Sequence, residues 1–314
     1  MAAVLVLLTV LLLSACSGIE LENKTEQVEG YTEEQAMILI ANERNRYQNA
    51  YTKAIWDVEV GEQHTKFERL LVQNVKQFME QMRLICMLAK ERGVTVSSQE
   101  RDALRQLSDT WISGLSEEDK RYIGCSRDDV QRVYTDYFLA NKFAAQLTAQ
   151  NKSEISDSQA KVIRVQQIVT SSLPKAKAVL KLVKIDKADF GSTAARYSET
   201  EETERELSRS GEDTLYERTA FALDEGEISN IVASDGLYYI IKCTDGYDEE
   251  ATKARKNRLQ KAIDQKTFQA VFAPYKEERN IRFSERFWNS IDLKEEPDSK
   301  TDNFFELYEA AFPE

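Results

Sequence analysis

Histidine and cysteine are scarce in this 314-residue chain, and their scarcity argues against several classes of chemistry. The single histidine, His64, stands in a polar stretch, so a catalytic triad or a histidine-rich metal site would have to use a residue that the pattern places in a loop. The four cysteines form no Cys-x-x-Cys pair and indicate neither a disulfide framework nor a zinc site. We therefore predict no metal, and we interpret Cys86 and Cys243 as small buried hydrophobic residues.

Nucleotide-binding signatures are also absent. There is no Gly-x-Gly-x-x-Gly and no phosphate-binding loop, so we predict no cofactor. The net charge of -12 lacks the basic footprint that phosphate binding needs, which argues against nucleic acid as a partner. Only 4 prolines and 31% charged residues favour a helix-rich protein, and the length suggests two domains.

The uncharged run at residues 2–13 is too short to span a bilayer, which needs about 20 residues. It ends in Leu13-Ser14-Ala15-Cys16, which resembles a bacterial lipobox, in which the cysteine thiol receives a diacylglyceryl group. This resemblance implies a lipoprotein signal peptide at residues 1–15 and a lipid anchor on Cys16. The alternative is a buried apolar helix or a short membrane anchor. Residues 16–30 are predicted to form a polar linker.

Residues 31–155 carry the signals of an α-helical domain. An apolar stripe runs through residues 67–89 and stops at Arg92-Gly93, as expected at the end of a helix. Capping-box patterns mark four further helix starts: Thr32-x-x-Gln35, Ser97-x-x-Glu100, Ser116-x-x-Asp119 and Ser126-x-x-Asp129. We expect five helices here.

After about residue 153 the pattern changes to that of a compact α+β unit, residues 159–245. The expected order is a strand at 162–169, helices at 175–183 and 190–197, a charged loop at 198–206, a helix at 215–223, and strand-like runs at 228–232 and 237–243 around a turn.

The remainder of the chain returns to a helical pattern. A helix is predicted over 249–278, with Pro274 kinking or ending it. We predict an α+β fold in which the segment 247–292 packs back onto the first five helices, so that the α+β unit is an insertion. Three consecutive domains are the alternative. Residues 293–314 are expected to be a polar linker and an aromatic tail, which docks onto its own helical domain or onto another molecule.

Three motifs of the α+β unit resemble those of parvulin-type peptidyl-prolyl isomerases, and they occur in the family's order. They are Ala188-Asp189-Phe190 with Ala194 to Ser198, Ala220 to Ser229, and Tyr238 to Lys242. The lipobox and the flanking helical segments resemble the PrsA/SurA type of extracytoplasmic foldase.

This resemblance implies catalysis of prolyl rotation, which has a barrier near ~20 kcal/mol. Parvulins use an apolar proline pocket beside two histidines. Gln167 and Tyr239 stand at the two histidine positions, so we assign no catalytic residue. The family's substrate-binding positions correspond to Tyr216, Phe221, Gln167 and Tyr239. We expect Gln167 and Tyr239 to hydrogen-bond each other.

An acidic residue, Glu212 or Asp213, is expected near the proline pocket, where it would incur a desolvation cost. We therefore predict a domain that is parvulin-like in shape and has weak or no isomerase activity.

The leading functional hypothesis is a chaperone, anchored at the outer face of the bacterial cytoplasmic membrane, that binds unfolded or newly secreted polypeptides. Its cradle would include Tyr134, Tyr137 and Phe138, unless these aromatics belong to the core. The alternatives are an active isomerase that works through desolvation alone and a lipoprotein that uses the fold as a binding scaffold. The sequence does not indicate an oligomeric state.

Overall fold

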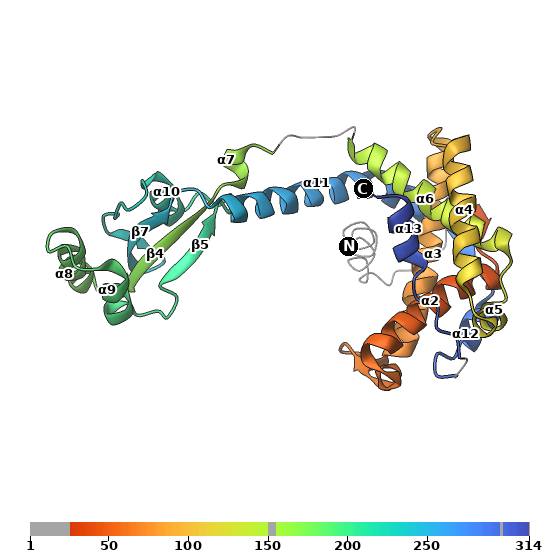
Figure 1. Cartoon of the computed structure of the whole chain (residues 1–314). Helices are drawn as coiled ribbons and strands as arrows, with labels where there is room; N and C mark the ends of the chain where they lie inside the picture. Colours follow the sequence, from red (N-terminus) through yellow and green to blue (C-terminus); the bar gives the residue numbers. More distant parts are fainter. Residues whose placement is uncertain (1–25, 150–154, 296–297, 314) are drawn as a thin grey trace. The chain divides into compact units, whose positions relative to one another are not determined.

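The computed structural model describes residues 26–149, 155–295 and 298–313. Cys16 and the predicted signal segment lie outside these residues. The chain divides into two compact units, one formed by Met1–Asn151 with Gln265–Glu314 and the other by Lys152–Asp264. The first unit is thus assembled from two separate stretches of chain (Figure 1).

The first unit is mainly helical. Its described elements are β1 Glu26–Glu29, α2 Glu33–Tyr51, the 3-10 helix η1 Lys53–Asp57, β2 Glu59–Val60, β3 Thr65–Lys66, α3 Phe67–Glu91, α4 Ser98–Gly114, α5 Glu117–Ile123, α6 Arg127–Ala149, the second part of α11 Glu249–Glu277, β8 Arg279–Arg282, α12 Glu285–Ser290 and α13 Phe304–Ala311. The helices α2 to α6 are the five expected from the sequence.

The four predicted capping boxes are all formed. At the start of α4, for example, the Ser97 hydroxyl accepts from the backbone N–H of Glu100, and the Glu100 carboxylate accepts from the backbone N–H of Ser97. Each box satisfies backbone donors that have no partner inside the helix. Local sequence therefore fixes where these helices begin.

Part of the predicted linker is a strand instead. Residues Glu26–Glu29 pair in parallel with Arg279–Arg282, and Glu26 forms a 3.1 Å ion pair with Arg279. Opposite charges on the two strands stabilise a pairing between segments that are far apart in the sequence. Residues 26–29 of the predicted polar linker 16–30 therefore form a strand.

The aromatic tail packs into the core of the first unit. Phe304 is fully buried, and its ring stacks on that of Tyr134 with centroids 3.9 Å apart. Tyr308 contacts Tyr137 edge-on at 4.6 Å, and Phe312 lies 4.8 Å from Phe138. The tail docks onto its own chain, and the aromatic residues proposed for an open cradle are covered by it.

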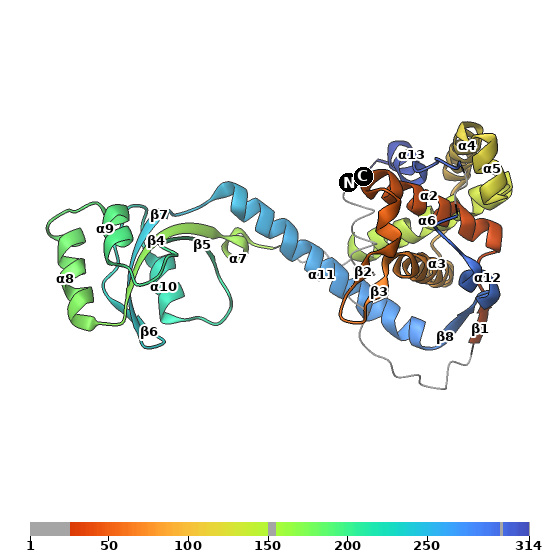
Figure 2. The same cartoon turned by 90° about the horizontal axis from the view of Figure 1, so that it is seen from below.

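The second unit is built on one sheet (Figure 2). Its strands are ordered β5-β4-β7-β6, and all neighbours are antiparallel. The elements are α7 Asp157–Ala160, β4 Val162–Thr170, α8 Leu173–Lys184, α9 Phe190–Tyr197, β5 Glu204–Ser208, α10 Leu215–Ala222, β6 Val232–Ser234 and β7 Leu237–Asp245, followed by the first part of α11.

The two faces of this sheet are covered by different helices. Ile240 packs with Val179 of α8 and Phe190 of α9, whereas its neighbour Ile241 packs with Ala220 of α10. Successive residues of a strand point to opposite faces, so α8 and α9 cover one face and α10 covers the other. The helices and the sheet together give an α+β fold, as predicted.

Two local predictions differ from the structure, and a third is narrowed by it. The charged loop predicted for 198–206 ends earlier, because β5 begins at Glu204 and pairs with β4. In the predicted strand 228–232, only Ile228 forms an isolated bridge, and β6 begins at Val232. Of the two outcomes predicted for Pro274, a kink or an end of the helix, the structure excludes the end, because α11 continues to Glu277.

The domain boundary also differs, because the residues of α11 up to Asp264 group with the sheet unit. Polar contacts fix this first part of the helix there: Thr252 accepts from the backbone N–H of Val162, and Arg255 donates to Ser208.

Among the described residues, no helix is both long and apolar enough to cross a membrane.

Candidate functional site

The positions carried over from the parvulin resemblance lie together on the α10 face of the sheet. Gln167 of β4 is directly opposite Ile241 of β7, and Val169 is opposite Tyr239. Gln167 and Tyr239 are therefore diagonal neighbours on one face. The helix α10 adds Tyr216 and Phe221, so all four sequence-predicted residues belong to one cluster.

Gln167 is 3% exposed, and both ends of its amide are bonded. Its Oε1 accepts a 2.8 Å hydrogen bond from the Tyr216 hydroxyl, and its Nε2 donates to the Glu202 carbonyl at 2.8 Å. The predicted Gln167–Tyr239 hydrogen bond is wrong. The diagonal register leaves room for Tyr216 to reach Gln167 from α10, and Tyr239 instead contacts the ring of Tyr216 edge-on at 5.1 Å.

The Tyr216 phenol is held neutral at the centre of this cluster. Burial raises the pKa of Tyr216 to about 12, although the nearby Arg205 acts in the opposite direction. A phenol that stays protonated donates its hydrogen bond to Gln167 over the whole physiological pH range. The site is therefore a fixed, neutral hydrogen-bonded network.

Two arginines that the sequence interpretation missed lie over the site's aromatic rings. The guanidinium of Arg205 is 5.8 Å from the ring centroid of Tyr216, and that of Arg209 is 4.4 Å from the ring of Phe221. Both distances are in the range of cation–π contacts. The pairing of Arg205 with Val165 places Arg205 on the face of Gln167, whereas Arg209 lies directly after the end of β5.

The predicted acid in the proline pocket is wrong. Glu212 and Asp213 are exposed, because Gly211 and Asp213 both have positive φ in a turn before α10. The buried acid is Glu217, and its carboxylate accepts from the backbone N–H and the hydroxyl of Ser210. These hydrogen bonds satisfy the Glu217 carboxylate at the start of α10, so this carboxylate does not enter an apolar pocket.

Histidine and cysteine take no part in this cluster. His64 is exposed in the β2–β3 turn, outside the sheet unit. Cys86 and Cys243 are fully buried, as predicted, and burial raises the pKa of both thiols. In residues 26–149, 155–295 and 298–313 no group of three potential metal ligands comes together.

Comparison with known proteins identifies this sheet unit. Residues 166–245 match the family model described as Rotamase, the PPIC-type peptidyl-prolyl isomerase domain. The chain contains a parvulin-type domain.

Curated relatives of the chain are foldase proteins. The chain is 27% identical over 176 residues to Foldase protein PrsA of Streptococcus agalactiae serotype V and of serotype III. Each match covers 51% of this chain and 57% of the relative, so the chain spans little more than half the length of these proteins. The resemblance to PrsA-type foldases with a parvulin-like domain is thereby confirmed.

Solved PrsA structures are also similar. The Streptococcus pneumoniae foldase is 18% identical, with a TM-score of 0.28 over 73% of this chain and 90% of that one. The Bacillus cereus protein is 19% identical, with a TM-score of 0.36 over 81% and 99%.

The parvulin-type domain has an unusual site chemistry. Where the resemblance implies two imidazoles, the carboxamide of Gln167 and the phenol of Tyr239 stand in their place. The cluster offers hydrogen bonds, aromatic surface and two exposed guanidinium groups. Such a set can contact a polypeptide segment through hydrogen bonds, aromatic surface and positive charge.

Proposed function

We propose that the protein is a membrane-tethered extracytoplasmic foldase, a chaperone for newly secreted polypeptides whose parvulin-type domain has weak or no isomerase activity. The observation that carries this proposal is the 2.8 Å hydrogen bond from Tyr216 to Gln167, because it occupies the centre of the site with a neutral, fully bonded pair. The names of the relatives, foldase protein PrsA, support the chaperone part.

The isomerase part is tested on the chain from Cys16 onward with a proline-containing peptide whose cis and trans forms are resolved by NMR. We expect cis/trans exchange close to the uncatalysed rate. Uncatalysed isomerisation takes roughly tens to hundreds of seconds. Rapid exchange that a parvulin inhibitor blocks would contradict the proposal.

An active isomerase is the second candidate, favoured by the aromatic surface that remains at Phe221. If desolvation alone accelerates rotation, Phe221→Ala should abolish the acceleration. Thr219→Ala is the matched control, since Thr219 lies on the same helix and its hydroxyl bonds only to the Leu215 carbonyl.

The chaperone part is tested by aggregation of an unfolded model protein. We expect suppression at stoichiometric ratios, and no suppression would exclude the chaperone role in favour of a scaffold.

Tethering is tested separately in a bacterial host. The full chain should fractionate with membranes, and Cys16→Ala should release it, because the proposed anchor depends on that thiol.

A further inference from the structure

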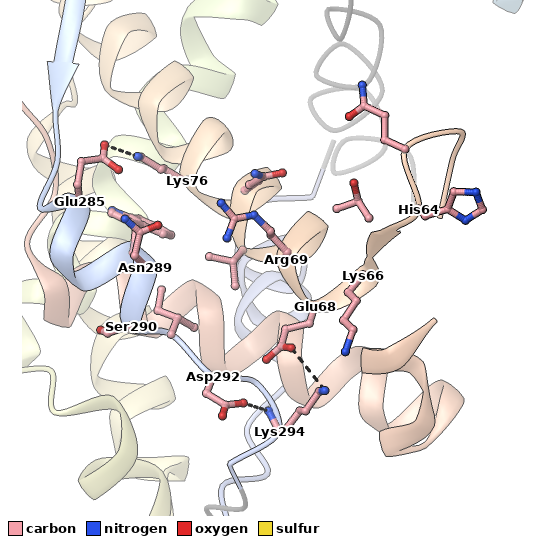
Figure 3. Close-up of a pocket in the computed structure, with 16 residues that line it drawn as sticks. His64, Lys66, Glu68, Arg69, Lys76, Glu285, Asn289, Ser290, Asp292 and Lys294 are labelled. Carbon is pink, nitrogen blue, oxygen red and sulfur yellow. Dashed lines mark hydrogen bonds and ion pairs between the residues drawn. The ribbon is translucent and has the colours of Figure 1, made fainter. Parts of the chain in front are cut away.

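The helical unit has an open groove away from the filled aromatic cluster of α6. The groove has a volume of about 960 Å³ and is formed by the β2–β3 hairpin, α3, α12 and the segment after α12 (Figure 3). Among the described residues, this groove is accessible, whereas the aromatic residues of the expected cradle are covered by the tail.

One face of α3 supplies the wall of this groove. Arg69, Val72, Gln73 and Lys76 line it at helical spacings of three and four residues. The helix α12 and the residue after it add Trp288, which is 6% exposed, and Ile291 to the lining. The groove lining is thus mainly polar, with a smaller apolar part.

The amide side chains of the lining suit a peptide backbone. Gln63, Gln73 and Asn289 each carry an amide that both donates and accepts, which matches the alternating N–H and C=O groups of an extended chain. Apolar surface continues outside the groove, since Val60 is 38% exposed and is the cross-strand partner of the lining residue Thr65. Residues on opposite strands in register share a face of the hairpin.

Most charged side chains of the groove lining are paired, and two of them, Arg69 and Asp292, are in no ion pair among the described residues. Lys76 binds Glu285 at 2.6 Å, and Lys294 binds Asp57 at 2.7 Å. The exposed Arg69 lies between the Lys76–Glu285 and Glu68–Lys294 pairs, and within the described residues it has no carboxylate within ion-pair distance (Figure 3). Its guanidinium is therefore available to an incoming carboxylate.

We propose that this groove binds an extended polypeptide segment that carries an acidic side chain, with Arg69 as the residue that binds the carboxylate. The inference rests on the proposed chaperone function and specifies which surface holds the client and which sequences it prefers. The preference is unexpected for a chain with a net charge of -12, whose average field repels acidic peptides.

The test uses two fluorescein-labelled, proline-free peptides, Ser-Gly-Leu-Asp-Leu-Gly-Ser and its Asn counterpart, with binding measured by anisotropy. We expect the protein to bind the Asp peptide more tightly. Arg69→Ala should weaken binding of the Asp peptide about tenfold and leave the Asn peptide unchanged, because one charge-assisted hydrogen bond is lost. Arg69→Lys should recover part of the difference.

Arg105→Ala is the matched control, since it removes an exposed arginine from α4, away from the groove. The proposal is overturned if neither peptide binds, if both peptides lose affinity equally in Arg69→Ala, or if the control has the same effect. Aggregation suppression by the unmodified protein separates the two proposals. If this protein suppresses aggregation but binds neither peptide, the groove is rejected and the chaperone function stands.

Discussion

The hydroxyl of Tyr216 and the carboxamide of Gln167 form a 2.8 Å hydrogen bond at the centre of the parvulin-type site. Tyr216 comes from α10 and Gln167 from β4, so the bond fixes the helix to the sheet. It also occupies the side chain that replaces the first family histidine.

Removing the phenol hydroxyl should destabilise the domain. Tyr216→Phe leaves the buried Gln167 oxygen without its donor, so we expect a loss of about 1–2 kcal/mol in the free energy of unfolding. The double variant Tyr216→Phe with Gln167→Leu should lose less stability than the two single variants lose together, with a coupling free energy of about 1 kcal/mol. Urea unfolding measures both quantities. Tyr238→Phe, on the opposite face of β7, serves as the control, and additive effects would contradict the bond's importance.

Restoring the two imidazoles tests whether their absence limits catalysis. We expect Gln167→His with Tyr239→His to accelerate prolyl exchange about tenfold or more over the original chain, equivalent to at least about 1.4 kcal/mol of barrier. Gln166→His with Tyr238→His places the same residues on the other face of the same strands and should change nothing. Equal rates in all three proteins would show that features beyond the imidazoles are missing.

Acid should weaken the sheet unit through Glu199. Hydrogen bonds from the Ser171 backbone, Lys175 and Thr170 lower the pKa of Glu199 from 4.5 to about 2. Because the folded-state pKa is depressed, this stabilisation is present above pH 4.5 and is lost as the pH falls towards 2. Glu199→Gln should therefore reduce stability at neutral pH, and the difference should vanish near pH 2. Glu201→Gln, whose exposed side chain receives none of these bonds, is the control for a pH series of urea melts.

The tail should be essential for the stability of the helical unit. Phe304 is fully buried against Tyr134 and Trp111, so Phe304→Ala should cost about 3–5 kcal/mol. Truncation after Asp292 should lower the melting temperature further, because it also removes the polar contacts of the segment. Phe312→Ala, at a partly exposed ring, should cost clearly less. An unchanged melting temperature in the truncated chain would indicate that the tail serves an external partner.

Much of the secondary structure was predictable, because its causes are local. The Ser97–Glu100 box marks the start of α4, and the Phe190–Tyr197 pattern gives the bounds of α9 without error. The parvulin motifs likewise identified the sheet unit and the four residues of its site. The strand β1 was missed, because its partner lies more than 250 residues away.

Inside the site, sequence determined the identities of the residues but not their partners. That Gln167 and Tyr239 replace imidazoles follows from the motifs alone, and so does the expectation of weak catalysis. That Gln167 bonds to Tyr216 and that Arg209 lies over Phe221 are decided by tertiary structure. Outside this site, the same holds for Arg69, which has no ion-pair partner among the described residues.

The physical reason is the range of the interactions involved. Helix caps and strand alternation depend on neighbours a few residues apart, so the chain itself specifies them. Hydrogen bonds and ring contacts between α10 and β4, or between α13 and α6, depend on register and on how each helix packs. Those distances exist only once the two units have folded.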